Sequence, residues 1–150
     1  IDIIQEQIRL ASGESLKIRQ KDVQVRGHTI ECRSNAEDPA KDFQPSPGLI
    51  ETFIPPGGPG VRVDSHCYSG YTIPSHYDSM IAKLITVAQT REEALTKMSR
   101  ALDEYIVEGI KTTLPFHRLL MQNNDFRAGK FTTKFLEDWD YKAELDKLKS

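Results

Sequence analysis

The sequence predicts an α+β domain in which an antiparallel sheet carries helices packed on one side. Short apolar segments, separated by turns rich in proline and glycine, occupy the stretch between Gly27 and Ala88. Helical spacing of apolar residues begins at Thr90 and also marks the first residues of the chain. A run of strands followed by a run of helices favours an α+β arrangement over an alternating α/β one.

Length and composition exclude several classes of protein. The chain has 150 residues, which suits one domain or one part of a larger protein. With 38% hydrophobic and 28% charged residues it is typical of globular proteins, and a net charge of −2 gives no basic stripe for a nucleic acid. No apolar run approaches the roughly 20 residues of a membrane span, and the first residues resemble no signal peptide. Two cysteines form no disulfide framework, so we expect a cytoplasmic location, or an organellar one in a eukaryote.

The first twelve residues are expected to form a helix that ends at Gly13, a residue suited to the left-handed conformation. The apolar residues that define this helix are Ile1, Ile4, Ile8 and Ala11. The chain opens inside this pattern and without methionine, so we expect a piece of a longer polypeptide. Residues 17–25 then predict a brief strand or turn.

The strand expected at about 27–35 carries charge on one of its faces. Alternation puts His28, Ile30 and Cys32 on a core face. The opposite face receives Thr29, Glu31, Arg33 and Asn35. Taken alone, this row indicates a solvated Glu31–Arg33 ion pair, which contributes only about 0–1 kcal/mol.

A second group of strands follows a loop at residues 39–48. Residues 49–54 and 61–64 predict a hairpin around the Pro- and Gly-rich turn at 55–60, and residues 68–74 leave room for one more short strand. Residues 79–88 are strongly apolar and β-branched at their end, which predicts a central strand.

The remaining residues are expected to form helices. Thr90 and Glu93 form a capping box, and an apolar stripe that reaches Tyr105 and Ile106 predicts one helix stopping near Gly109. Its width predicts packing on the sheet. Further helices are expected at 114–121 and, shorter, within 131–139. The charged residues 140–150 are expected to fray or to form a loose helix.

Three motifs together resemble the C-terminal domain of biotin carboxylase. They are Glu-Cys-Arg-Ser-Asn-Ala-Glu-Asp-Pro at 31–39, Pro-Ser-Pro-Gly at 45–48 and Tyr-Asp-Ser-Met-Ile-Ala-Lys-Leu at 77–84. The similarity runs from Ile1 to about Glu137. It implies that 1–12 lead in from an ATP-grasp domain outside this sequence, that 13–139 form the C-terminal domain completing the ATP-grasp enzyme, and that 140–150 are a charged tail.

The resemblance implies a ligase that uses ATP and bicarbonate to carboxylate biotin held on a carrier domain. ATP and Mg²⁺ would be bound mainly by the preceding part, so these 150 residues alone are expected to be inactive. Implied partners are the rest of the carboxylase chain, the biotin carrier domain, a carboxyltransferase and a second copy in a homodimer. The acyl-CoA or keto acid acceptor, as in acetyl-CoA, propionyl-CoA and pyruvate carboxylases, is left open.

The resemblance assigns the principal site role to Arg33. Biotin must lose a proton from its ureido ring, and a fixed guanidinium beside the resulting negative oxygen would act as in an oxyanion hole. Glu31 either orients Arg33 or remains a solvated neighbour. Asp78 is a turn residue or a support of the biotin- and bicarbonate-binding side. Asn35, Glu37 and Asp38 are expected to shape the loop rather than to react.

Other residues are assigned to more distant contacts. Thr133 matches a position that packs on the ATP adenine, although the family often has an aliphatic residue there. Pro59 and Arg62 match a dimer surface on which the family often has an aromatic residue near Pro59. No metal site is expected in this segment, since its cysteines and histidines lack C-x-x-C or H-x-x-x-H spacing.

A different class of function remains open at this point. The chain could be a non-catalytic α+β module that takes part in subunit docking and has kept the scaffold. Biotin-dependent ATP turnover with the preceding part present separates this interpretation from the carboxylase.

Overall fold

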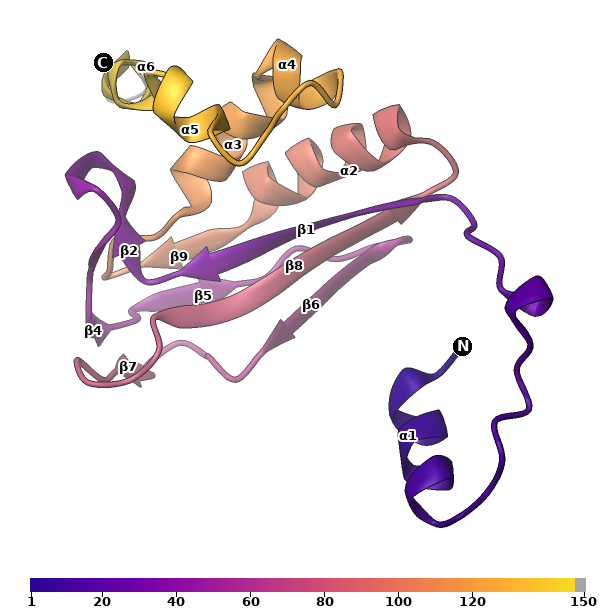
Figure 1. Ribbon diagram of the computed structural model, residues 1–150. Coiled ribbons are helices and arrows are strands. Elements are labelled where there is room, and N and C mark those ends of the chain that lie inside the picture. The colour runs from indigo at the N-terminus through magenta and orange to yellow at the C-terminus, as the bar shows by residue number, and fades with distance from the viewer. Residues whose placement is uncertain (148–150) are drawn as a thin grey trace.

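The computed structural model describes residues 1–147 and confirms the α+β class (Figure 1). A three-stranded antiparallel sheet has the order β1-β8-β6. Its strands are β1 (His28–Asn35), β8 (Met80–Ala88) and β6 (Val61–Ser65). Helices α2 to α6 all lie on one side of this sheet, as predicted.

Three two-stranded sheets surround the main one. They are β2 (Glu37–Asp38) with β3 (Gln44–Pro45), β4 (Gly48–Leu49) with β7 (Thr72–Ile73), and β5 (Thr52–Ile54) with β9 (Ile106–Glu108). A 3₁₀ turn, η2 (Pro39–Lys41), lies in the loop between β2 and β3. The short strand expected within 68–74 is therefore present as β7.

The hairpin predicted over 49–64 is wrong. The first expected strand, 49–54, is interrupted after Leu49. The Ile50 amide donates to the Tyr71 carbonyl at 2.9 Å, and the Glu51 amide donates to the Glu108 carbonyl at 2.9 Å. The second half, β6, pairs with β8 instead. Local alternation identified the strands, but their partners come from distant parts of the chain. The strand alternative for 17–25 is also wrong, because only a 3₁₀ turn, η1 (Gln20–Asp22), forms there.

The core lies between the sheet and α2 (Arg91–Glu104). The apolar stripe of α2 is fully buried against β1 and β8, which confirms the predicted packing; its residues are Ala94, Leu95, Met98, Ala101 and Leu102. The capping box also forms, with the Thr90 hydroxyl accepting from the Glu93 amide at 3.2 Å and the Glu93 carboxylate accepting from the Thr90 amide at 3.2 Å. Strand β8 is central, as predicted.

The predicted end of this helix near Gly109 is wrong. Helix α2 ends at Glu104; Tyr105 is extended and only 1% exposed, and Ile106 begins β9. The apolar spacing continues past the helix because Tyr105 packs into the same core, with its ring 5.7 Å from that of Phe53.

The C-terminal helices form a layer beyond α2. They are α3 (Leu114–Gln122), α4 (Asn124–Arg127), α5 (Phe135–Asp138) and α6 (Tyr141–Lys147). The sequence predicted α3 and α5 but not α4. Of the two alternatives for the tail, a helix forms over 141–147 as α6 and fraying is wrong there, because Leu145 is 4% exposed and the Tyr141 ring lies 5.3 Å from that of Phe116. Residues 148–150 of the charged tail lie outside the described residues.

Helix α1 (Ile3–Ala11) forms as predicted but buries none of its residues. Its apolar side chains, Ile3, Ile4 and Ile8, are exposed. Figure 1 shows it at the end of an extended connection, apart from the sheet. None of the helices between residues 1 and 147 combines the length and apolarity that crossing a bilayer demands.

Candidate functional site

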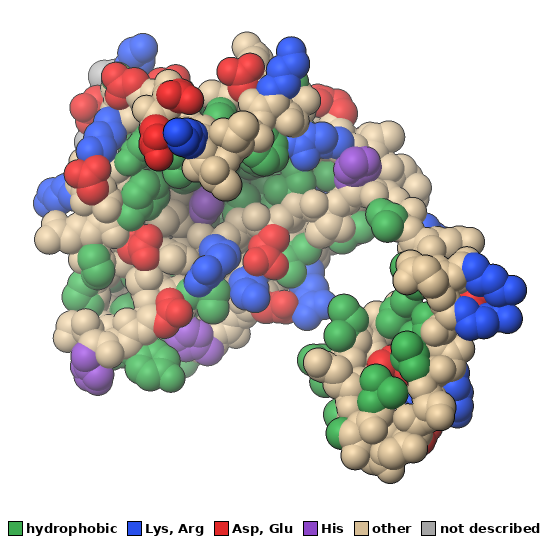
Figure 2. Space-filling model, viewed as in Figure 1, with side chains coloured by type: hydrophobic (Ala, Val, Ile, Leu, Met, Phe, Trp, Pro, Cys, Tyr) green, Lys and Arg blue, Asp and Glu red, His purple; other side chains and the backbone are tan. Residues whose placement is uncertain are grey.

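The face of the sheet turned away from α2 carries a patch of charged side chains. Arg33 on β1 pairs with Lys83 on β8, which in turn pairs with Asp64 on β6. Two residues further along β8, Ile85 pairs with Glu31 on β1 and with Arg62 on β6. Paired residues of antiparallel strands project to the same face. Figure 2 shows side chains of both charges side by side over the middle of these strands.

The guanidinium of Arg33 is exposed and has no hydrogen bond or ion pair with any side chain of residues 1–147. The ion pair that composition suggested between Glu31 and Arg33 does not form. Arg62 lies on the same face, and its Nε donates to the Asp64 carboxylate at 2.9 Å, so this guanidinium already has a partner. Arg33 is therefore a fork of charged donors that remains available to a group from outside the described residues.

The backbone of Arg33 is fixed, in contrast, by the start of α3. The Thr113 hydroxyl donates to the Arg33 carbonyl at 3.1 Å, and His117 Nε2 donates to the same oxygen at 2.9 Å. Burial lowers the pKa of His117, opposed by its bond to this carbonyl. Sequence reasoning missed both residues, which lie 80 and 84 positions from Arg33. The one local signal is a threonine just before the helix-starting Leu114-Pro115, an N-cap position.

The end of β1 is closed by a small polar cluster. Glu37 accepts hydrogen bonds from Asn35 Nδ2 at 3.0 Å and from the Ser79 hydroxyl at 2.5 Å. Asp38 accepts from the Ala40 amide at 3.0 Å, which starts the η2 turn. These bonds give Asn35, Glu37 and Asp38 the loop-shaping contacts that the sequence predicted. Ser79 was not singled out from the sequence.

Asp78 lies at the same end of the sheet as Arg33. Its carboxylate accepts from the Met80 amide at 2.8 Å, which is the bond of a turn residue at a strand entry. Met80 pairs with Asn35, so Asp78 is near the position where β1 finishes. It is exposed, and this backbone bond leaves its second oxygen available.

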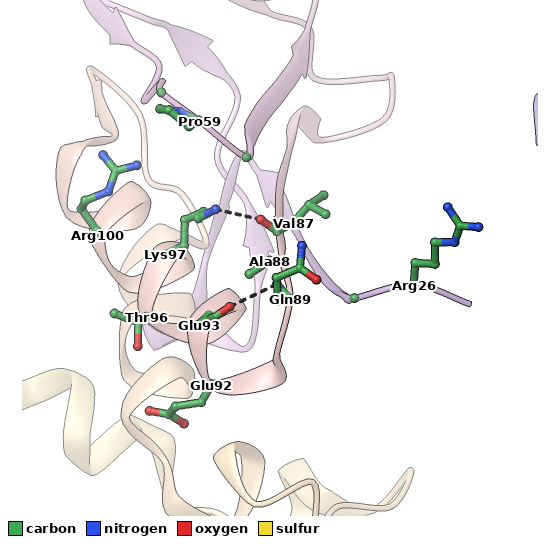
Figure 3. A pocket seen from close by; sticks show the side chains of 13 residues that line it. Arg26, Pro59, Val87, Ala88, Gln89, Glu92, Glu93, Thr96, Lys97 and Arg100 are labelled. Atoms are coloured by element: carbon green, nitrogen blue, oxygen red, sulfur yellow. Dashed lines mark hydrogen bonds between the residues drawn. The ribbon is translucent and has the colours of Figure 1, made fainter. Parts of the chain in front are cut away.

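Pro59 lies toward the opposite end of the sheet, in an open cavity of about 990 Å³ formed with the end of β8 and the first turns of α2 (Figure 3). There the Lys97 ammonium donates to the Val87 carbonyl at 2.8 Å. Thr133 is exposed in the segment between α4 and α5, in the helical layer. The structure therefore does not bring Pro59 or Thr133 together with Arg33.

Within residues 1–147 no group of three or more histidine, cysteine or carboxylate side chains is arranged to hold a metal ion. Cys32 and Cys67 are free thiols. Burial raises the pKa of Cys32 to about 12, with a smaller contribution from Glu31. Cys67 Sγ lies 3.6 Å from His66 Nε2. Burial raises the pKa of the Cys67 thiol as well.

Comparison with known proteins connects this geometry to a family. Residues 31–138 match the family model of the biotin carboxylase C-terminal domain. The chain is 57% identical over 139 residues to biotin carboxylase 1 of Bacillus subtilis, covering 93% of this chain and 31% of that protein. It is 54% identical over 137 residues to the biotin carboxylase of Pseudomonas aeruginosa, covering 91% of this chain and 30% of that protein.

A solved structure agrees with these relatives. The biotin carboxylase domain dimer of the Hydrogenobacter thermophilus 2-oxoglutarate carboxylase, in complex with MgADP, ADP and bicarbonate, superposes with a TM-score of 0.88. It is 49% identical, and the match covers 92% of this chain and 30% of that one. The chain thus spans about a third of the length of the relatives it matches. By sequence and by fold, this chain belongs to the biotin carboxylase C-terminal domain family.

Proposed function

We propose that this chain is the C-terminal part of a biotin carboxylase, which uses ATP and bicarbonate to carboxylate biotin held on a carrier domain. The family membership and the relatives named biotin carboxylase support this activity. The observation that carries the role of this part is the Arg33 guanidinium, unpaired among the described residues and exposed on the sheet face away from α2.

The proposed chemistry gives Arg33 one task. ATP and bicarbonate form carboxyphosphate and ADP, and carboxyphosphate decomposes to carbon dioxide and phosphate. When the ureido ring of biotin gives its N–H proton to this phosphate, negative charge moves onto the ring oxygen, and the nitrogen then attacks the carbon dioxide to form carboxybiotin. A guanidinium held at that oxygen lowers the free energy of the charged form, because its donors are oriented before the charge develops. By the family resemblance, ATP and Mg²⁺ are assigned mainly to the preceding part of the protein.

The remaining site assignments form part of the same proposal. Glu31 orients the guanidinium of Arg33 once the preceding part closes over this face, and Asp78 supports the biotin- and bicarbonate-binding end. Thr133 packs on the ATP adenine. Pro59 and Arg62 belong to a homodimer surface, an assignment supported by the dimer of the 2-oxoglutarate carboxylase relative.

The domain organisation follows the same reasoning. Residues 1–12 lead in from the ATP-grasp domain, 13–139 form the C-terminal domain and 140–150 are the tail. The exposed apolar stripe of α1 supports the first assignment, because such a stripe normally packs against a partner surface. The carrier domain and a carboxyltransferase complete the proposed set of partners.

The test measures ATP turnover of the full-length carboxylase with bicarbonate, in the presence and absence of free biotin. Arg33→Ala is expected to reduce biotin carboxylation about 100- to 1000-fold, the range found for loss of one oxyanion donor. Turnover of ATP without biotin is expected to persist. Arg26→Ala is the matched control, because it removes an exposed arginine just before the start of the same strand.

Two outcomes would contradict the proposal. If biotin never stimulates turnover in the full-length protein, the non-catalytic subunit-docking module becomes the better interpretation. If biotin is carboxylated at the normal rate by the Arg33→Ala protein, the carboxylase activity stands but the role of Arg33 fails.

A further inference from the structure

The backbone around Arg33 is held from outside the sheet ladder. Among residues 1–147, strand β1 is an edge strand, since it pairs with β8 alone in the order β1-β8-β6. At its free edge the Arg33 carbonyl accepts from the Thr113 hydroxyl and from His117 Nε2. The same hydroxyl accepts from the Asn35 amide at 3.0 Å, and the Thr113 amide donates to the Asn35 carbonyl at 3.1 Å. Four hydrogen bonds thus join residues 33–35 to the start of α3.

These bonds lie where the β1–β8 ladder is least regular. Register is continuous from His28 to Ser34 and then shifts between Ser34 and Asn35. A bulge of this kind bends the strand and re-aims the side chains beside it. The contacts from Thr113 and His117 therefore fix the backbone on both sides of the irregular step, at Arg33 and at Asn35.

Both residues give up an ordinary hydrogen bond in making these contacts: Thr113 forgoes the capping bond of α3, and His117 leaves Nδ1 without a partner among the described residues. Thr113 is the N-cap residue of α3, yet its side chain makes no capping hydrogen bond, because the hydroxyl is committed to β1. The carbonyl of Arg33 can only accept, so Nε2 of His117 carries the proton and Nδ1 is a bare acceptor. That Nδ1 is buried and without a partner among the described residues. A buried nitrogen without a hydrogen-bond partner lowers the stability of the fold, so its presence in a native structure needs an explanation.

We propose that Thr113 and His117 are positioning residues for Arg33, holding its backbone so that its side chain leaves the open face of the sheet at a fixed point and with a fixed Cα–Cβ direction. This inference rests on the role proposed above for Arg33. The carbonyl and the side chain of one residue share the same Cα, so a shift of the strand edge moves the guanidinium with it. Misplacement of a catalytic group by about 1 Å can cost about 100-fold in rate.

The test uses Thr113→Val and His117→Ala in the full-length carboxylase. Both are expected to lower the kcat for biotin carboxylation about tenfold, while ATP turnover with bicarbonate but without biotin changes less than about twofold. His117→Gln is expected to restore most of the lost rate, because a glutamine amide can donate near the position of Nε2. Thr113→Val is nearly isosteric and keeps the test available if His117→Ala does not fold.

Thr86→Val is the matched control for Thr113→Val. The Thr86 hydroxyl is also buried and also donates to a carbonyl at 3.1 Å, that of Ala94, but it lies away from Arg33. It is expected to reduce stability to a similar extent without a selective loss of biotin carboxylation. Proportional loss of both activities in the Thr113 and Thr86 variants would overturn the inference, since that pattern describes a purely structural contact.

A double substitution separates this inference from the proposed function. In an Arg33→Ala background, His117→Ala is expected to cause no further loss of carboxylation, because it acts through the missing side chain. An additional tenfold loss there, or a normal rate in the single His117→Ala protein when Arg33→Ala is inactive, would overturn the positioning role alone. A fully active Arg33→Ala protein would instead overturn the role of Arg33, and the positioning role with it.

Discussion

Arg33 and Lys83 stand directly opposite each other on β1 and β8, on the sheet face away from α2. Like charges in this position destabilise a sheet slightly, and neither side chain has an ion pair with another side chain of residues 1–147. Asp64, on the far side of Lys83, is bonded to Arg62. The pairing therefore leaves local positive charge at this point, which suits a face that meets a group with developing negative charge.

The first prediction concerns Arg33→Lys. The substitution keeps the charge but replaces the planar fork of donors by a single ammonium group. We expect the kcat for biotin carboxylation by the full-length protein to fall about 10- to 100-fold. The free energy of unfolding, measured in urea, should change by less than about 0.5 kcal/mol, as for an exposed side chain. A loss of stability that accounts for the loss of activity would contradict the assignment.

The second prediction concerns Gly109, which joins β9 to the segment before α3. Its φ is +95°, and an added Cβ would lie 2.3 Å from the Leu49 carbonyl oxygen and 2.9 Å from the Glu51 amide nitrogen. Because both atoms belong to the backbone, we expect Gly109→Ala to cost about 3 kcal/mol of unfolding free energy.

Gly70→Ala is the control for this steric effect. Gly70 has nearly the same φ, +94°, but nothing lies within 4 Å of the added Cβ. Its substitution should cost only the left-handed backbone strain, about 1 kcal/mol. Equal losses in the two variants, by urea unfolding, would mean that the close approach of Leu49 and Glu51 contributes nothing.

The third prediction concerns the reactivity of the two thiols. Cys32 is 3% exposed and burial raises its pKa to about 12, so almost none of it is thiolate at neutral pH. We expect a disulfide exchange reagent to leave Cys32 unmodified in the native protein and to modify both cysteines in urea. Mass spectrometry of the labelled peptides identifies each site. Native labelling of Cys32 at the rate found in urea would contradict its burial.

The sequence predicted those parts of the fold that depend on local pattern. The buried strand β8 and the capped helix α2 were predicted because apolar spacing and the Thr90–Glu93 box are contained within a few residues. The hairpin at 49–64 failed because β5 finds its partner in β9 and β6 finds its partner in β8. Strand propensity says where a strand is, whereas pairing depends on the whole topology.

The candidate site shows the same division. Alternation along β1 correctly placed Arg33 on an exposed face and Cys32 in the core, but it was wrong for His28, which is exposed at the start of the strand. It could not show that the neighbouring Glu31 leaves Arg33 unpaired, because two side chains on one face can still point apart. Nor could it find Thr113 and His117, since their contacts with Arg33 follow from the packing of α3 against the edge of the sheet.

The last prediction is a pH dependence of stability due to His117. Burial lowers its pKa in the folded protein below the ordinary value of 6.5, so below that pH the unfolded chain binds a proton more readily. The free energy of unfolding should therefore be at its full value above pH 6.5 and fall as the pH drops toward the lowered folded pKa. Urea unfolding at several pH values between about 5 and about 8 measures this slope.

His117→Gln isolates this histidine's part of the slope. Glutamine does not titrate and can still donate to the Arg33 carbonyl, so the variant should keep most of its stability at neutral pH and lose less of it on acidification. The difference between the two proteins should therefore shift in favour of the variant as the pH falls below 6.5. A constant difference across this range would show that His117 protonates equally well in both states. A shift in favour of wild type would mean that the imidazolium is stabilised in the fold, against the buried and unpartnered position of Nδ1.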